Sequence, residues 1–171
     1  MWFVIHVKPG TETQAVSLLK STSKSDALQE VFCPMVEYTR RDHGKLCVAA
    51  EPMFEGKVFA VAPSKWELRA CMQKAPELEV LYSTSPSFEP LEPGGIDFIN
   101  AWAAAPGRVC AQSEAEVDKA GAMTITAGPL LGHEDEITKF SSGRRWAYLE
   151  TQIAGQPTRA HVGVRVTKNE S

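Results

Sequence analysis

Two adjacent arginines followed by alternating aromatic residues form the segment of this sequence best suited to bind a ligand. Arg144 and Arg145 follow a turn-forming Ser-Ser-Gly, and Trp146 and Tyr148 then alternate with aliphatic residues. Because successive side chains of a strand point to opposite faces, one face of this strand is aromatic and the other aliphatic. If the aliphatic face fills the core, the rings lie outside beside the arginines, where they suit stacking on unpaired bases and neutralising phosphates.

Other cations near this segment would extend such a surface: Lys139, Arg159, Arg165 and Lys168. The opposite orientation, with Trp146 pointing inward, is the alternative, because tryptophan is large and commonly buried. The sequence leaves both orientations open.

No combination of residues predicts catalysis. The four histidines have no Cys, Ser or paired-carboxylate partner at a diagnostic spacing. The four cysteines are scattered without metal-ligand spacing, and Gly94-Gly95 lacks the strand and further glycines of a phosphate-binding loop. We therefore expect a protein that is not an enzyme and that holds no cofactor or metal ion.

The first hundred residues predict a mixed α+β layer, in which an antiparallel sheet is backed by helices. Expected strands are 2–7, 31–36 with a break at Pro34, 46–50, 58–61 and 80–82. Expected helices begin at Thr11 and at Ser64, each with a capping-box pattern, and a third covers 96–105. Residues 39–45 form the tip of a hairpin.

Beyond this layer the pattern changes to short strands separated by turn residues. The stretch 109–119 is polar and acidic, which favours an exposed linker. The expected strands that follow are 122–126, 136–140, 145–153, 159–161 and 164–167. Five short strands in so few residues predict a small five-stranded β-barrel.

Composition sets broad limits on partners and location. The chain has 171 residues, 43% of them hydrophobic, and a net charge of −3, so contact with nucleic acid must rest on a local patch. No apolar run approaches the roughly 20 residues that a membrane span requires, and the N-terminus lacks a signal-peptide pattern. We expect a cytoplasmic monomer without membrane contact.

The order of several short segments resembles the NusG family of transcription elongation factors. Trp-Phe-Val-Ile at 2–5, with Gly10 and Glu12, matches the opening of the family's N-terminal domain. Met-Phe-Glu-Gly-Lys-Val-Phe at 53–59 stands where the family usually has Phe-Pro-Gly-Tyr-Val. The similarity is carried by the order of these segments rather than by any one of them.

Two turns further along the chain are similar to those of a KOW domain, at residues 127–132 and 154–157. The resemblance implies an N-terminal domain at 1–105, a linker at 106–112 and a KOW domain at 113–171. Within the family, the compact linker and residues 127–132 look most like the specialised antitermination paralogue LoaP.

The resemblance implies a non-enzymatic factor that rides on bacterial RNA polymerase. In the family, an apolar pocket of the N-terminal domain binds the polymerase clamp helices, which carries over to Phe54 first, with Trp2 and Phe3 near it. Helix-in-groove recognition of this kind depends on a few aromatic anchors. Trp2 and Phe3 alternate along one strand and cannot both face the same pocket, so a purely structural role in the core stays open for them.

Three cations are candidates for contact with the non-template DNA strand. Lys8 follows the first strand, where some specialised paralogues touch DNA, and Arg40 and Arg41 lie on the expected hairpin tip, where they can reach phosphates. Solvated surface charge is the alternative for all three.

Two departures from the family pattern bear on local geometry. Glu55 and Lys57 replace the usual Pro and Tyr, which predicts a more charged and less rigid loop. Asp135 occupies what is usually a glycine of the KOW motif, so its backbone must avoid strongly positive φ or use the tolerance of Asp for the left-handed region.

The resemblance favours a processive antitermination factor whose KOW domain reads nascent leader RNA. A general elongation or termination factor is the first alternative, with a KOW domain that recruits Rho or a ribosomal protein. A translation-machinery protein that uses its barrel to bind ribosomal RNA is the second.

Overall fold

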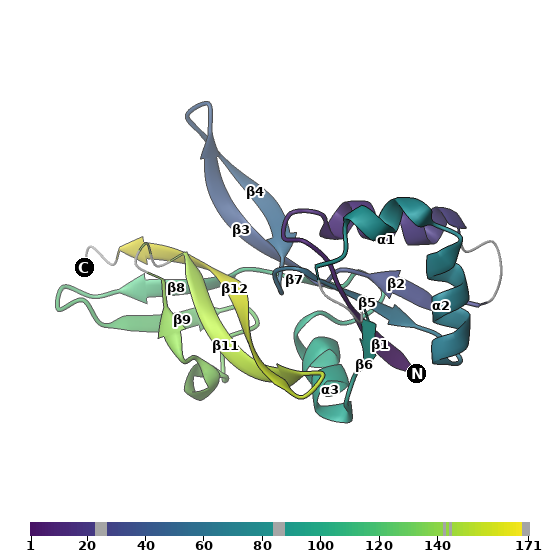
Figure 1. Cartoon of the computed structure of the whole chain (residues 1–171). Helices are drawn as coiled ribbons and strands as arrows, with labels where there is room; N and C mark the ends of the chain where they lie inside the picture. The colour runs from purple at the N-terminus through teal and green to yellow at the C-terminus, as the bar shows by residue number, and fades with distance from the viewer. Residues whose placement is uncertain (23–26, 84–87, 142, 144, 169–171) are drawn as a thin grey trace.

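A computed structural model describes residues 1–22, 27–83, 88–141, 143 and 145–168 of the chain (Figure 1). Its first half contains a four-stranded sheet with strand order β2-β5-β1-β6, and a long hairpin projects from this layer. A five-stranded sheet with order β10-β11-β12-β8-β9 forms the second half. The elements of the first half are β1 (Trp2–His6), α1 (Glu12–Thr22), β2 (Glu30–Phe32), β3 (Met35–Asp42), β4 (Lys45–Pro52), β5 (Lys57–Val61), α2 (Lys65–Gln73), η1 (Pro76–Val80), β6 (Phe88–Pro90) and α3 (Pro93–Trp102).

Alternation along β1 divides the N-terminal sheet between two cores. Phe3 and Ile5 pack with residues of α1 and α2 on one face, whereas Val4 belongs to the cluster on the other face. β1 pairs antiparallel with β5 on one side and with β6 on the other. This arrangement confirms the mixed α+β class that the sequence predicts, with both faces of the sheet covered.

The two expected helix starts differ in how they are held. At α2 the Ser64 side chain accepts from the Glu67 backbone N–H and bonds the Glu67 carboxylate, which confirms the capping box. At α1 the Thr11 hydroxyl instead donates to the Lys8 carbonyl at 2.6 Å. The predicted capping role of Thr11 is therefore replaced by a bond back to the turn after β1.

Pro34 separates β2 from β3, as its missing N–H predicts. β3 and β4 then form the expected hairpin, but its tip is shorter than the predicted 39–45. Residues 39–42 pair with β4, and only His43 and Gly44, both at positive φ, make the turn. In Figure 1 this hairpin stands out from the body of the molecule.

The prediction of a closing strand at 80–82 is wrong. The chain there forms the 3-10 turn η1, started by Pro76, and only an isolated bridge joins Tyr82 to Val7. The strand that completes the sheet is β6, which pairs with Phe3, Val4 and Ile5. A helical turn prevails because the proline near its start presets φ and its buried Leu78 packs into the core.

The second half follows the predicted strand-rich pattern with different boundaries. Its elements are β7 (Val109–Cys110), β8 (Ser113–Val117), β9 (Met123–Ala127), η2 (Glu134–Glu136), β10 (Lys139–Phe140), β11 (Trp146–Ile153) and β12 (Gln156–Lys168). The expected strand at 136–140 is reduced to β10, because acidic residues before it form a 3-10 turn. The two strands expected at 159–161 and 164–167 are one continuous β12.

The acidic stretch expected to be exposed is largely ordered as strand. β7 pairs parallel with β3, and β8 pairs parallel with β12, with Ser113 fully buried at its start. The described strands make an open sheet in the order given above, and they do not close into the predicted barrel. β8 was hidden from sequence reasoning because its alternate residues are glutamates that point to solvent.

Both halves share one hydrophobic core. It joins Val4, Phe54 and Trp102 of the first half to Ala147, Leu149 and Val162 of the second. α3 lies between the N-terminal sheet and β11 in Figure 1 and supplies much of this contact. None of the helices in the described part of the chain is long and apolar enough to cross a membrane.

Candidate functional site

Phe54 lies at the centre of an aromatic cluster and is fully buried. Its ring centroid is 5.7 Å from that of Phe59 and 6.0 Å from that of Phe98, and Phe98 in turn lies 6.2 Å from Trp102. The cluster joins the core that both halves share. The C-terminal sheet therefore helps to cover the face of the N-terminal sheet on which Phe54 lies.

A buried carboxylate holds the turn that follows Phe54. Glu12 accepts from the backbone N–H of Gly56 at 2.7 Å and from that of Gly10 at 2.9 Å. Gly56 has φ +74°, and a Cβ there would lie 2.8 Å from the Val7 carbonyl oxygen, so the turn requires glycine. The sequence predicts a less rigid loop at Glu55 and Lys57. In the structure the Glu12 carboxylate holds this loop through the Gly56 N–H.

Trp2 and Phe3 lie on opposite faces of β1, as strand alternation requires. Phe3 is fully buried on the α1 and α2 face, with its ring 6.0 Å from Phe88. Trp2 is half-buried on the face of Phe54 and meets Phe32 edge-on at 5.6 Å. Of the two, only Trp2 lies on the face of the Phe54 cluster.

A buried arginine joins the connection between the two halves to the N-terminal sheet. Arg108 donates to both carboxylate oxygens of Glu30, at 2.6 and 2.9 Å, and to Asn100 at 2.8 Å. Its guanidinium also lies over the rings of Phe32 and Trp2, at 4.3 and 5.1 Å. A bidentate arginine–carboxylate pair sets orientation as well as distance, so this contact holds the start of the C-terminal half against the N-terminal sheet.

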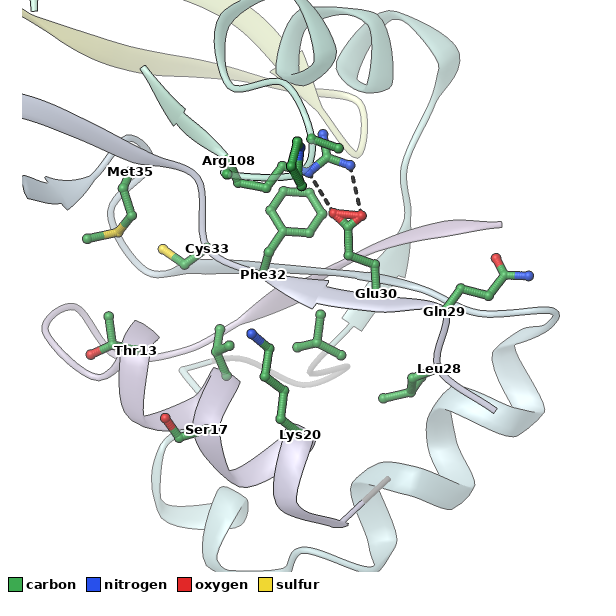
Figure 2. Close-up of a pocket in the computed structure, with 15 residues that line it drawn as sticks. Thr13, Ser17, Lys20, Leu28, Gln29, Glu30, Phe32, Cys33, Met35 and Arg108 are labelled. Carbon is green, nitrogen blue, oxygen red and sulfur yellow. Dashed lines mark hydrogen bonds and ion pairs between the residues drawn. The ribbon is translucent and has the colours of Figure 1, made fainter. Parts of the chain in front are cut away.

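Figure 2 shows this ion pair at the rim of a cleft between α1 and β2. The Lys20 ammonium points into the cleft from α1, and the Cys33 thiol faces it from the chain after β2. Burial, and secondarily the charge of Glu12, raises the pKa of the Cys33 thiol to about 12, so the thiol stays protonated and unreactive at neutral pH.

The two halves approach most closely where β12 crosses β3. A Cβ on Gly163 would lie only 2.0 Å from the Glu37 carbonyl oxygen. Beside this crossing, His161 Nε2 lies 2.9 Å from Glu51 Oε1, and the His161 backbone N–H donates to the Met53 carbonyl at 3.4 Å. The contact therefore reaches the residue immediately before Phe54.

On β11 the aliphatic residues point into the core, and Trp146, on the opposite face, packs against the edge of that core. Ala147 and Leu149 are buried, whereas Trp146 and Tyr148 are half-exposed. Trp146 packs against Tyr38 of the hairpin, at 5.0 Å between ring centroids, and edge-on to His161 at 4.6 Å. One ring of the predicted RNA surface is thus engaged by the N-terminal half.

Two of the predicted cations lie over aromatic rings at this surface. Arg159 lies over the Tyr148 ring at 5.0 Å and Arg145 over the Tyr38 ring at 5.7 Å. Trp146, Tyr148, Arg159 and His161 form one wall of a hollow between the halves, opposite Glu51 and Glu55. Of the other predicted residues, Lys139 and Arg165 are exposed, and Lys168 lies on β12. Arg144 lies outside the described residues.

The three predicted DNA contacts do not form one surface. Arg40 and Arg41 are both exposed, but they are neighbours on β3 and point to opposite faces of the hairpin. Lys8 is exposed at the turn after β1, where its backbone N–H donates to Leu81. Each is accessible to solvent on its own.

Sequence reasoning missed the residues that join the halves: Glu30, Tyr38, Glu51, Arg108, His161 and Gly163. A usable signal was present only for Gly163, because a glycine between two valines in a strand indicates close backbone approach. Asp135 lies in η2 and is not among the residues with positive φ, so one of the two conformations expected of it is confirmed. Within the described residues no group of three potential ligands is placed to hold a metal ion.

Comparison with known families gives one match. Residues 1–80 match the family model described as "Transcription termination factor nusG". A comparison with curated proteins finds no match. The matched region contains β1, the β3–β4 hairpin and the Phe54 turn, so the similarity to this family lies in the first 80 residues of the chain.

Proposed function

We propose that this chain is a transcription elongation and antitermination factor. Its N-terminal half binds the clamp helices of bacterial RNA polymerase, and its C-terminal half binds nascent leader RNA. The observation that carries the proposal is the NusG match over residues 1–80, which includes Phe54 and Phe59 of the aromatic cluster. A cluster of aromatic side chains on one sheet face is the kind of anchor that receives partner helices.

Binding through Phe54 requires that the halves separate. Phe54 is fully buried in a core that the C-terminal sheet completes, so a polymerase helix reaches it only when that sheet has moved away. Among the described residues, the polar contacts that must break include His161 with Glu51, the His161 backbone N–H with the Met53 carbonyl, and Gly155 with Glu92. We infer that the arrangement in Figure 1 is the state before recruitment.

Separation would also release the proposed RNA surface. Trp146 now packs on Tyr38, and its strand neighbour Tyr148 faces the hollow between the halves. Once the halves have separated, the two rings would stack on bases, and Arg145, Arg159 and Arg165 would contact phosphates. These residues lie on or beside the paired strands β11 and β12. The turn at residues 127–132, which resembles that of the specialised paralogue LoaP, supports RNA rather than protein as the ligand.

The RNA contact is tested by titrating the full chain with leader RNA from the operon beside its own gene. We expect saturable binding that prefers this RNA to a scrambled one. Arg145→Glu with Arg165→Glu should weaken it about tenfold or more, because both side chains are exposed and each reversal replaces a phosphate contact with repulsion. Lys119→Glu, in the exposed β8–β9 turn, is the matched control and should change binding less than about threefold.

A chain that binds polymerase but shows no RNA preference would contradict the RNA half of the proposal. It would favour a general elongation or termination factor whose C-terminal half recruits Rho or a ribosomal protein. Failure to bind polymerase at all would instead favour a protein of the translation machinery.

A further inference from the structure

The cleft between α1 and β2 has the size and lining of a site for a small molecule. It encloses about 720 Å³, and small-molecule sites usually measure about 300–1,000 Å³. Its apolar lining includes Val16, Leu28, Val31, Phe32 and Met35. On the helix side, Thr13, Ser17 and Lys20 line it from one face of α1 (Figure 2). An apolar surface with a few convergent polar groups is typical of such sites.

The outer edge of β2 borders the cleft. β2 is the outermost strand of the N-terminal sheet, and the consecutive residues 28–33 all line the cleft. Because successive side chains of a strand point to opposite faces, a surface lined by every residue runs along the edge of the strand. An outer edge presents backbone N–H and C=O groups. The cleft therefore offers backbone groups as well as side chains to an occupant.

The charged residues that line the cleft leave one positive charge. Arg108, at the rim, is held by both carboxylate oxygens of Glu30, so these two charges offset each other. The Lys20 ammonium points into the cleft. In the described part of the chain no carboxylate lies within ion-pair distance of Lys20. This balance suits an occupant with a single negative charge.

We propose that this cleft binds a small apolar monoanion, in the form of an aryl or alkyl carboxylate. The apolar body would pack against Val16, Leu28 and Val31, and the carboxylate would accept from the Lys20 ammonium. The Thr13 and Ser17 hydroxyls, on the same face of α1, are further donors. A dianion would be repelled by the Glu30 carboxylate at the rim.

A peptide that adds a strand to β2 is the other occupant that an open edge can receive. β2 has only three residues, and Pro34, which has no backbone N–H, follows it closely. An added strand would therefore find a short ladder of hydrogen bonds. This makes a small molecule the better fit.

The cleft is separate from both contacts of the proposed function. Neither Phe54 nor the rings of β11 are among the residues that line it. One of its walls is formed by residues 105–108, which belong to the connection between the halves. An occupant would therefore touch α1, β2 and this connection together, beside the Arg108 and Glu30 pair. The proposal does not depend on binding to polymerase or RNA.

The test is an NMR titration of the full chain with 1-naphthoate and with its neutral isostere 1-naphthamide. We expect saturable binding of 1-naphthoate with a Kd of about 0.1–1 mM, as is usual for a ligand of this size. The largest shifts should occur at the backbone amides of residues 13–20 and 28–33. 1-Naphthamide should bind about fivefold or more weakly, because it lacks the charge that meets Lys20.

Two variants with matched controls assign the binding to this cleft. Lys20→Met should weaken 1-naphthoate about fivefold and change 1-naphthamide less than about twofold, since only the charge is lost. Lys74→Met is its control, because Lys74 is also a cation at the C-terminal end of a helix but does not line the cleft. Ser17→Trp should abolish binding of both ligands by filling the cleft. Ser21→Trp, on an exposed part of the same helix outside the cleft, should leave both unchanged.

Three results would overturn the proposal. One is a set of shifts confined to the Phe54 cluster or to the hollow between the halves. Another is equal binding of the two ligands that Lys20→Met does not alter, because an anion would then gain nothing from the cleft. The third is displacement of 1-naphthoate at lower concentration by an uncharged pentapeptide of alternating valine and threonine, which would identify a strand-binding edge instead. Ser17→Trp counts only if its melting temperature matches that of Ser21→Trp.

Discussion

Replacing Gly163 by alanine is expected to separate the two halves of the protein. The added Cβ would lie 2.0 Å from the Glu37 carbonyl oxygen, which is far inside contact distance. Both groups belong to or are attached directly to backbone, so no rotamer change relieves the overlap. The β12 and β3 strands must therefore move apart at their crossing.

The energetic consequence can be bounded. Overpacking a well-packed contact costs about 1–3 kcal/mol, and more when only backbone can yield. On a chain of this size such a loss lowers the melting temperature by about 3–10 °C. We expect this decrease by circular dichroism, with strand content retained, together with a larger radius of gyration by small-angle X-ray scattering.

Gly94→Ala provides the control for this prediction. Gly94 lies in α3, and a Cβ there meets nothing within 4 Å. Because alanine favours helix over glycine, this variant should be at least as stable as the unaltered chain and equally compact. Unchanged compactness and stability in Gly163→Ala would mean that the halves do not hold each other as Figure 1 shows.

Replacing Arg108 by methionine should cost about 2–4 kcal/mol of unfolding free energy, because it leaves the Glu30 carboxylate without its partner. The side chain of Arg108 is 7% exposed and that of Glu30 is 31% exposed, so the stranded charge keeps only partial access to water. The variant also loses the bond to Asn100 and the contacts over the Phe32 and Trp2 rings. Urea unfolding measures the loss.

The double variant Glu30→Gln with Arg108→Met separates charge burial from packing. It removes the unpaired charge, so it should recover at least half of the loss. A single variant with the stability of the unaltered chain would show that the pair contributes nothing. A double variant no better than the single one would assign the loss to packing around the guanidinium instead.

Local patterns predicted most of the elements because their causes are local. The Ser64 capping box, the break at Pro34 and the alternation in β11 each depend on residues within a few positions of one another. The alternation in β11 predicted that Trp146 and Tyr148 share one face of the strand, but it left open which face points to the core. The family resemblance singled out Phe54 as a candidate contact but did not predict its burial.

What the sequence did not predict depends on contacts between distant segments. Arg108 meets Glu30 across 78 positions, and His161 meets Glu51 across 110, so no short pattern contains either pair. β6 completes the sheet in place of the expected strand because pairing with β1 is decided by tertiary geometry. β8 was missed because its glutamates read as an exposed linker, whereas its pairing with β12 and β9 makes it part of a sheet.

Titration with RNA polymerase is the most direct test of the proposed function. Core polymerase should be titrated with the unaltered chain, with Gly163→Ala and with Gly94→Ala, and binding followed by surface plasmon resonance. We expect saturable binding by all three and tighter binding by Gly163→Ala, because in the other two chains separating the halves offsets part of the binding free energy. No saturable binding by any of the three would contradict the assignment as an elongation factor.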